Sequence, residues 1–222
     1  MRKFGTATVA AVLLLSACSG QMAAEKAKAP ANMAHAHMGH VTTSWKDTPD
    51  KMGLLPTAMA EAKIAKQHAT LVLQQPANLA WLKTHTGHVI NAVDPSVEAE
   101  GPGLGYGVMK AAAGVNQHIN LAAGSDGASG NVKAHAEHVG TSAQNTVDWA
   151  RLIVALGQRV QASDNAANAT VMVSQINGLA DQLISGTDAN KDGKVTWVKG
   201  EGGLGQSELH MGFMSKGEGL TN

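Results

Sequence analysis

A block of 31 residues occurs twice in this 222-residue chain, and its histidines recur at identical spacing. Residues 59–89 align with residues 109–139 without a gap and share nine identical positions, where average composition gives about two by chance. The identities include the pairs His68/His118, His85/His135 and His88/His138. The connecting residues 72–82 and 122–132 share nothing. A repeat that keeps its imidazoles and varies its loop indicates two similar units that carry a histidine site.

Apolar residues at intervals of three and four predict that both units are helical. The predicted helices cover about residues 55–74, 77–93, 106–123, 131–162 and 164–186, and another covers about 205–215. Pro76 and the turn sequence 124–127 separate the two helices of each unit. We therefore predict an all-α fold, in which residues 53–186 form an antiparallel helical bundle. It consists of two tandem helical hairpins plus an extra helix.

The hairpins are predicted to converge their histidines. His85 and His88 are three residues apart and share one helix face, and the turn lies near the middle of the 17 residues between His68 and His85. Antiparallel pairing then brings His68 level with that pair. The same argument joins His118 to His135 and His138. The predicted metal ligands are His68, His85, His88, His118, His135 and His138.

Three histidines with one open position are typical of catalytic zinc, and six could hold two metals if both hairpins face one axis. The arrangement is similar to the metal sites of ferritin-like bundles, with His where those have Glu. The alternative is that these histidines are ordinary surface or core residues of amphipathic helices.

Residues 1–17 are predicted to be a signal peptide. A basic start, Arg2 and Lys3, precedes an apolar segment too short to cross a bilayer. Residues 15–18, Leu-Ser-Ala-Cys, resemble the lipobox of bacterial lipoproteins, which implies cleavage before Cys18 and acylation of its thiol. We therefore expect a lipid-anchored protein of the bacterial envelope that faces the periplasm, and Ser19 favours the outer membrane. An ordinary secretory signal is the alternative.

Composition excludes several kinds of bond, ligand and partner. Cys18 is the only cysteine, which excludes a disulfide within the chain and a Cys metal ligand in the acylated protein. Residues 18–222 contain 15 basic and 17 acidic residues, so nucleic acid is not an expected partner. The sequence shows no phosphate loop and no C-x-x-C-H haem attachment motif.

Residues 18–52 are rich in Ala, Lys, Met and Pro and show no apolar periodicity, which predicts a flexible tether. His35, His37 and His40 lie within it, next to methionines. Imidazole and thioether ligands together suit copper, so the segment is predicted to be a secondary site of metal capture. A linker that happens to contain these residues is the alternative.

Residues 187–222 are predicted to form a calcium loop and a short helix. Residues 188–193, Asp-Ala-Asn-Lys-Asp-Gly, resemble the start of an EF-hand loop. The ligands that this resemblance implies are Asp188, Asn190, Asp192, the carbonyl of Lys194, Thr196 and Glu201. The chain departs from the pattern at Lys199, where the motif has Glu, and Glu201 is the candidate replacement. The alternative is a turn capped by its own Asx side chains.

The His-bearing, Ala-rich helices of residues 55–140 resemble the small periplasmic His-rich metal-binding proteins of bacteria. This resemblance implies buffering, sequestration or delivery of divalent copper, zinc or nickel to a receiving protein. The alternatives are a His-ligated hydrolase or oxidase, a bis-His haem-b bundle, and a structural or interaction lipoprotein stabilised by calcium. An enzyme also needs a general base. No carboxylate is an obvious candidate, so we expect binding rather than catalysis and assign no catalytic residue.

Overall fold

The computed structural model describes Met1 and residues 32–220, and it confirms the all-α fold. The helices are α1 (Met33–Thr42), α2 (Leu54–Leu71), α3 (Leu79–Val93), α4 (Val108–Gly124), α5 (Gly130–Ala162), α6 (Ala166–Ser185) and α7 (Leu204–Gly217). Short 3-10 turns occur at Pro49–Lys51 and Val72–Gln74. No strand is found within residues 32–220. The predicted signal peptide beyond Met1 and the acylation site Cys18 lie outside the described residues.

The helices from α2 onward begin and end within a few residues of the predicted positions. Three of them start at side-chain caps. The side-chain oxygens of Asn78, Ser129 and Asn165 each accept a hydrogen bond from the backbone N–H three residues later, at 3.0–3.1 Å. Such caps satisfy backbone donors that have no partner inside the helix. None of the described helices is long and apolar enough to cross a bilayer.

Small side chains fill much of the bundle core. Ala58, Ala62, Ala65 and Ala69 form a fully buried stripe along α2, at the spacing of one helix face. On α5, Gly157 lies where a Cβ atom would come within 2.8 Å of the Ile90 side chain. The helices therefore approach closely although the chain has few aromatic residues.

The prediction of a flexible tether over residues 18–52 is wrong for its second part. Residues 33–42 form α1, whose side chains Ala34, Met38 and Val41 are buried in the bundle core. The helix is hard to recognise in the sequence, because only three apolar side chains of this short Ala- and Met-rich segment reach the core. Residues 43–53 then lead into α2.

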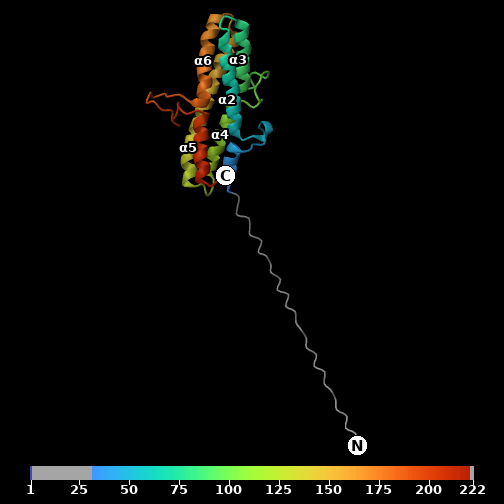
Figure 1. Ribbon diagram of the computed structural model, residues 1–222, viewed down its shortest axis with the longest axis vertical. Helices are drawn as coiled ribbons and strands as arrows, with labels where there is room; N and C mark the ends of the chain where they lie inside the picture. Colours follow the sequence, from blue (N-terminus) through green and yellow to red (C-terminus); the bar gives the residue numbers. More distant parts are fainter. Residues whose placement is uncertain (2–31, 221–222) are drawn as a thin grey trace. The chain divides into compact units, whose positions relative to one another are not determined.

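Three loops project from the sides of the bundle, after α1, α3 and α6 (Figure 1). The buried carboxylate of Glu61 accepts hydrogen bonds from three backbone N–H groups of the loop after α3, at 2.9–3.0 Å. The buried side chain of Asn145 makes three hydrogen bonds with the backbone of the loop after α6, at 2.8–3.0 Å. These two loops are thus fixed relative to the helices that carry the histidines.

Candidate metal centres

Nine of the ten histidines form three clusters, which we call triads. Triad 1 is His37, His40 and His118; triad 2 is His68, His85 and His88; triad 3 is His135, His138 and His210. In each triad the candidate ligand atoms all lie within 4.8 Å of one another. Each combines two histidines three residues apart on one helix with a lone histidine from another helix.

Triad 2 is assembled inside one hairpin, as the sequence predicts. The Nδ1 atom of His68, on α2, lies 3.0 Å from Nδ1 of His85 and 3.2 Å from Nδ1 of His88, both on α3. The indole N–H of Trp81 donates to the carbonyl of Leu71 at 3.1 Å, which ties the start of α3 to the end of α2. The hairpin register therefore places the three imidazoles together.

Triad 1 corrects the prediction for His118. This histidine does not meet His135 and His138 of its own hairpin. Its Nδ1 atom instead lies 3.0 Å from Nδ1 of His37 and 3.4 Å from Nδ1 of His40, both on α1. The segment predicted to be a secondary capture site thus supplies two members of a main cluster.

Triad 3 contains a residue that the sequence analysis missed. Nδ1 of His210, on α7, lies 3.2 Å from Nδ1 of both His135 and His138 on α5. A signal for it exists in the sequence. The pattern His-x-x-His-Val occurs three times, at 37–41, 85–89 and 135–139, and three such pairs call for a third lone histidine besides His68 and His118.

The two repeats differ because the equivalent faces of α2 and α4 pack against different helices. In the first repeat Lys66 and Thr70 contact α6, where both bond the side chain of Asn177. The equivalent residues of the second repeat, Asn116 and Asn120, instead face α5, where a Cβ atom added to Gly140 would lie 3.1–3.5 Å from their side chains.

The lone histidine lies two positions from each of these residues, about 200° away around the helix. Because the α4 face with Asn116 and Asn120 packs against α5, His118 lies on the opposite face of α4. There it meets α1 rather than α5. The prediction for His118 is wrong because the two repeats do not present the same face to the following helix.

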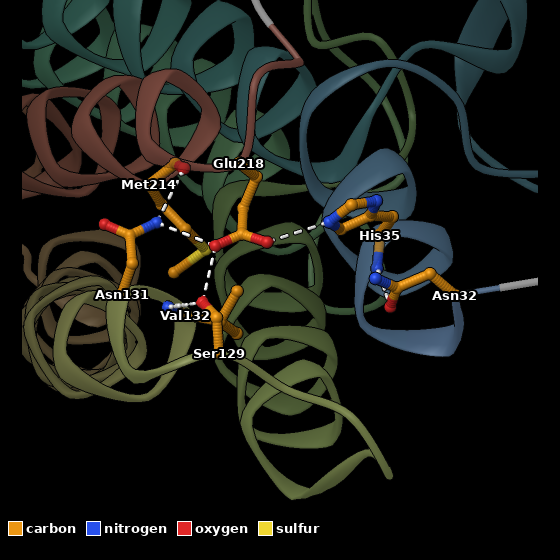
Figure 2. A network of polar contacts seen from close by, with 7 residues as sticks. All are labelled: Asn32, His35, Ser129, Asn131, Val132, Met214 and Glu218. Carbon is orange, nitrogen blue, oxygen red and sulfur yellow. Dashed lines mark hydrogen bonds and ion pairs between the residues drawn. The ribbon is translucent and has the colours of Figure 1, made fainter.

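His35 belongs to none of the triads. Its Nε2 atom lies 2.9 Å from a carboxylate oxygen of Glu218 (Figure 2). Glu218 also accepts hydrogen bonds from Ser129 and Asn131. These hydrogen bonds, with that of His35 first, lower the pKa of Glu218 to about 2. His35 therefore fastens α1 to the bundle and, unlike His37 and His40 of the predicted capture segment, lies outside the triads.

The spacing of the nitrogens suits a shared metal ion better than hydrogen bonding. The lone histidine of each triad has its Nδ1 atom 3.0–3.4 Å from the Nδ1 atoms of both partners. An imidazole nitrogen carries either one proton or one lone pair, so it can satisfy only one such neighbour. A metal bound at 2.0–2.1 Å in tetrahedral geometry sets its nitrogen ligands about 3.3 Å apart.

Burial favours the neutral form of six of these nine imidazoles. It lowers the pKa of six triad histidines, two from each triad, and neighbouring imidazoles lower it further. They are His40, His118, His68, His85, His138 and His210. The largest change is at His210, whose pKa falls to about 4. Since only neutral imidazole binds a metal, the lone pairs are available near pH 7.

An indole ring lies against each triad. Trp45 contacts His40 and His118, with ring centroids 4.8 and 4.5 Å apart. Trp81 lies 4.1 Å from His85, and Trp197 stacks on His138 at 4.1 Å. These rings cover one side of their imidazoles and limit the directions from which an exogenous ligand can approach.

The triads lack the protein partners that fix many metal ligands. Within residues 32–220, no Nε2 atom of a triad histidine is hydrogen-bonded to another residue, and no carboxylate joins a triad as a fourth ligand. Metal-ligating histidines commonly donate their second N–H to a carboxylate or a carbonyl, which orients the ring and strengthens binding. The triads are thus suited to ions that exchange.

The EF-hand-like loop folds as an Asx-rich turn. Asp188, Asn190 and Asp192 accept hydrogen bonds from backbone N–H groups of residues 192–194 at 2.9–3.1 Å. Glu201, the predicted substitute for the carboxylate that Lys199 replaces, does not join them. It is buried and accepts hydrogen bonds from the backbone N–H and the hydroxyl of Thr196.

That arrangement matches the alternative interpretation of the loop, in which its own side chains cap the turn. It leaves the half-buried Asp188 and the exposed Asn190 and Asp192 as the oxygen donors of the predicted calcium site. No family model, curated protein or solved structure matches the chain.

Proposed function

We propose that this protein binds divalent transition metals at three separate histidine sites and buffers, sequesters or delivers them. The observation that carries the proposal is the convergence of nine imidazoles into three triads with ligand-like spacing. Imidazole nitrogen suits zinc, divalent copper and nickel. The predicted lipid anchor at Cys18 supports a place in the bacterial envelope, facing the periplasm.

The chemistry of the triads favours storage and transfer over a permanent structural site. Three protein ligands leave one coordination position for water or for a ligand from a receiving protein. Within residues 32–220 the ligands have no fixed protein partner on their second nitrogen, so an ion can exchange. Haem with two axial histidines fits less well, because axial ligands lie on opposite sides of the iron, whereas all three nitrogens here meet within 4.8 Å.

One observation, at triad 1, favours catalysis. A cavity of about 340 Å³ beside His118 is lined by Trp45, Asp47, Tyr106 and Lys110, among others. The Tyr106 hydroxyl lies 3.3 Å from Asp47, and burial together with this carboxylate raises the pKa of Tyr106 to about 12. A zinc-loaded protein that hydrolyses an activated ester, and loses this activity in Asp47→Asn, would support an enzyme.

Metal stoichiometry tests the main proposal. The wild-type protein should bind three equivalents of zinc, measured by mass spectrometry of the metals after removal of free ions. His68→Ala, His118→Ala and His210→Ala should each bind two. The matched control His35→Ala removes an imidazole outside the triads and should still bind three at saturating zinc. Equal stoichiometry in all four variants would refute the triads as metal sites.

A further inference from the structure

α1 depends on the rest of the bundle more than any other ligand-bearing helix. It has 10 residues, whereas an isolated helix shorter than about 12–15 residues is marginal in water. Its apolar contribution to the core is limited to Ala34, Met38 and Val41. The helices that carry triads 2 and 3 have 14 to 33 residues. Whether α1 stays docked therefore depends on its few remaining contacts.

Two sets of polar contacts fasten α1 to the bundle. His37 and His40 meet His118 of α4 in triad 1. One turn earlier, His35 meets Glu218, which follows α7. The same carboxylate accepts hydrogen bonds from two residues at the start of α5, Ser129 at 2.5 Å and Asn131 at 3.0 Å. Figure 2 draws this network around Glu218. The Glu218 network thus joins α1, α5 and α7.

We propose that triad 1 is a metal-operated latch: an ion bound by His37, His40 and His118 fixes α1 on α4, and loss of the ion releases residues 33–53 from the bundle. The proposal rests on the proposed metal binding of the triads. Two of the three ligands belong to α1, so the ion binds tightly only when α1 is docked. Its binding free energy therefore adds to the stability of the docked state.

Release of α1 changes where the chain leaves the bundle. The first packed helix is then α2, which begins at Leu54 rather than at Met33. A chain anchored at Cys18, as the lipobox resemblance implies, gains the length of residues 33–53 between anchor and bundle. Metal occupancy of one site would thereby set how far the other two sites can reach from the membrane.

Hydrogen exchange of α1 tests the latch. The full-length protein is compared at pH 7 in a chelator and in zinc at about 100 times the dissociation constant of triad 1. Backbone amides of residues 36–42 should exchange about 100-fold more slowly with zinc, because mass action shifts the docking equilibrium by that factor. His118→Ala should abolish the effect. His68→Ala, the matched control in triad 2, should bind one zinc fewer and keep it.

Because His118 is buried, His118→Ala could lose the zinc effect simply by misfolding. A second variant distinguishes misfolding from loss of the metal ligand. The double substitution His37→Ala with His40→Ala leaves α4 intact and should also abolish the zinc effect. Three bound zinc ions with unchanged exchange in α1 would overturn the latch while leaving the metal function intact. No zinc bound at any triad would overturn the metal function itself, so the two failures are distinguishable.

Glu218→Gln tests the second contact. It removes the charge that pairs with His35 and should speed the exchange of α1 about tenfold in zinc, since hydrogen bonds to charged groups are among the stronger ones. The effect in chelator should be smaller, because α1 is already released there. The zinc-dependent slowing should remain. Affinity at triad 1 should fall, and affinity at triad 2 should not. Unchanged exchange in Glu218→Gln would show that the network does not hold α1 and would overturn this part of the proposal.

Discussion

Triads 1 and 2 use the same position of the repeat, yet they are assembled in different ways. His68 finds its partners 17 and 20 residues away, across a single turn. The partners of His118 lie 81 and 78 residues earlier in the sequence, on α1. The repeat has preserved which helix face carries the imidazole, while the neighbour of that face has changed. A repeated sequence therefore predicts a repeated site only when the packing around it is repeated as well.

The largest expected effect separates independent sites from one shared site. His68→Ala combined with His85→Ala, both in triad 2, should cost little more than either change alone, because one lost ligand already weakens that site more than about 100-fold. His68→Ala combined with His118→Ala should remove two equivalents of metal. Titration against a competing chelator measures both. Strong coupling between His68 and His118 would restore the single six-histidine site.

Acid should empty the triads in a defined order. Protons compete with the metal for each imidazole and cost up to about tenfold in affinity per pH unit and ligand below its pKa. The pKa of His210 is the lowest, at about 4, because burial and its two partners disfavour the charged form. Triad 3 should thus keep zinc to the lowest pH. Dialysis at stepwise lower pH checks this, since His210→Ala should lose the zinc that wild type retains longest.

The same pKa values predict how the metal-free protein responds to pH. The pKa of His210 is lowered on folding from 6.5 to about 4, so between these values the unfolded chain binds more protons. Stability therefore decreases as the pH falls from about 6.5 to about 4, and changes little from this residue below that. Urea denaturation at several pH values measures the slope. A flatter slope is expected for His210→Ala.

A smaller effect is expected from making the second repeat resemble the first. Gly140 stands where the first repeat has Ile90, and a Cβ atom there would lie 3.1 Å from the Asn116 side chain. Gly140→Ile should overpack the contact between α4 and α5 and destabilise the protein by about 1–3 kcal/mol in thermal denaturation. Gly178→Ile, where a Cβ meets nothing within 4 Å, is the control and should not destabilise.

Calcium should produce the smallest change. We expect the loop oxygens of Asp188, Asn190 and Asp192 to bind it with a dissociation constant of ~0.1–1 mM, since Lys199 replaces the bidentate carboxylate. At ten times that concentration the protein should gain about 1.4 kcal/mol of stability, visible as a higher melting temperature. Asp188→Ala with Asp192→Ala should remove the gain and leave zinc binding unchanged. A melting temperature insensitive to 10 mM calcium would show a simple turn.

The sequence predicts what is local. Helix periodicity placed α2 to α7 within a few residues, and the turn between His68 and His85 was enough to assemble triad 2. What failed depends on contacts between distant segments. α1 was missed although Ala34, Met38 and Val41 have the spacing of one helix face, because three apolar positions in a 10-residue segment are too few to distinguish a helix from a linker. His210 was missed because its partners lie more than 70 residues earlier, on a helix whose proximity no spacing reveals.

The indole rings beside the triads have a spectroscopic consequence. Trp45, Trp81 and Trp197 each contact the imidazoles of a different triad, and the fourth, Trp149, is buried in the core. A paramagnetic ion such as divalent copper quenches nearby indole fluorescence over short distances. Three variants, each keeping only one of Trp45, Trp81 and Trp197, would then report by fluorescence quenching how far each of the three triads is filled. Titration with copper would then give the order in which the sites fill from intrinsic fluorescence, without an added label.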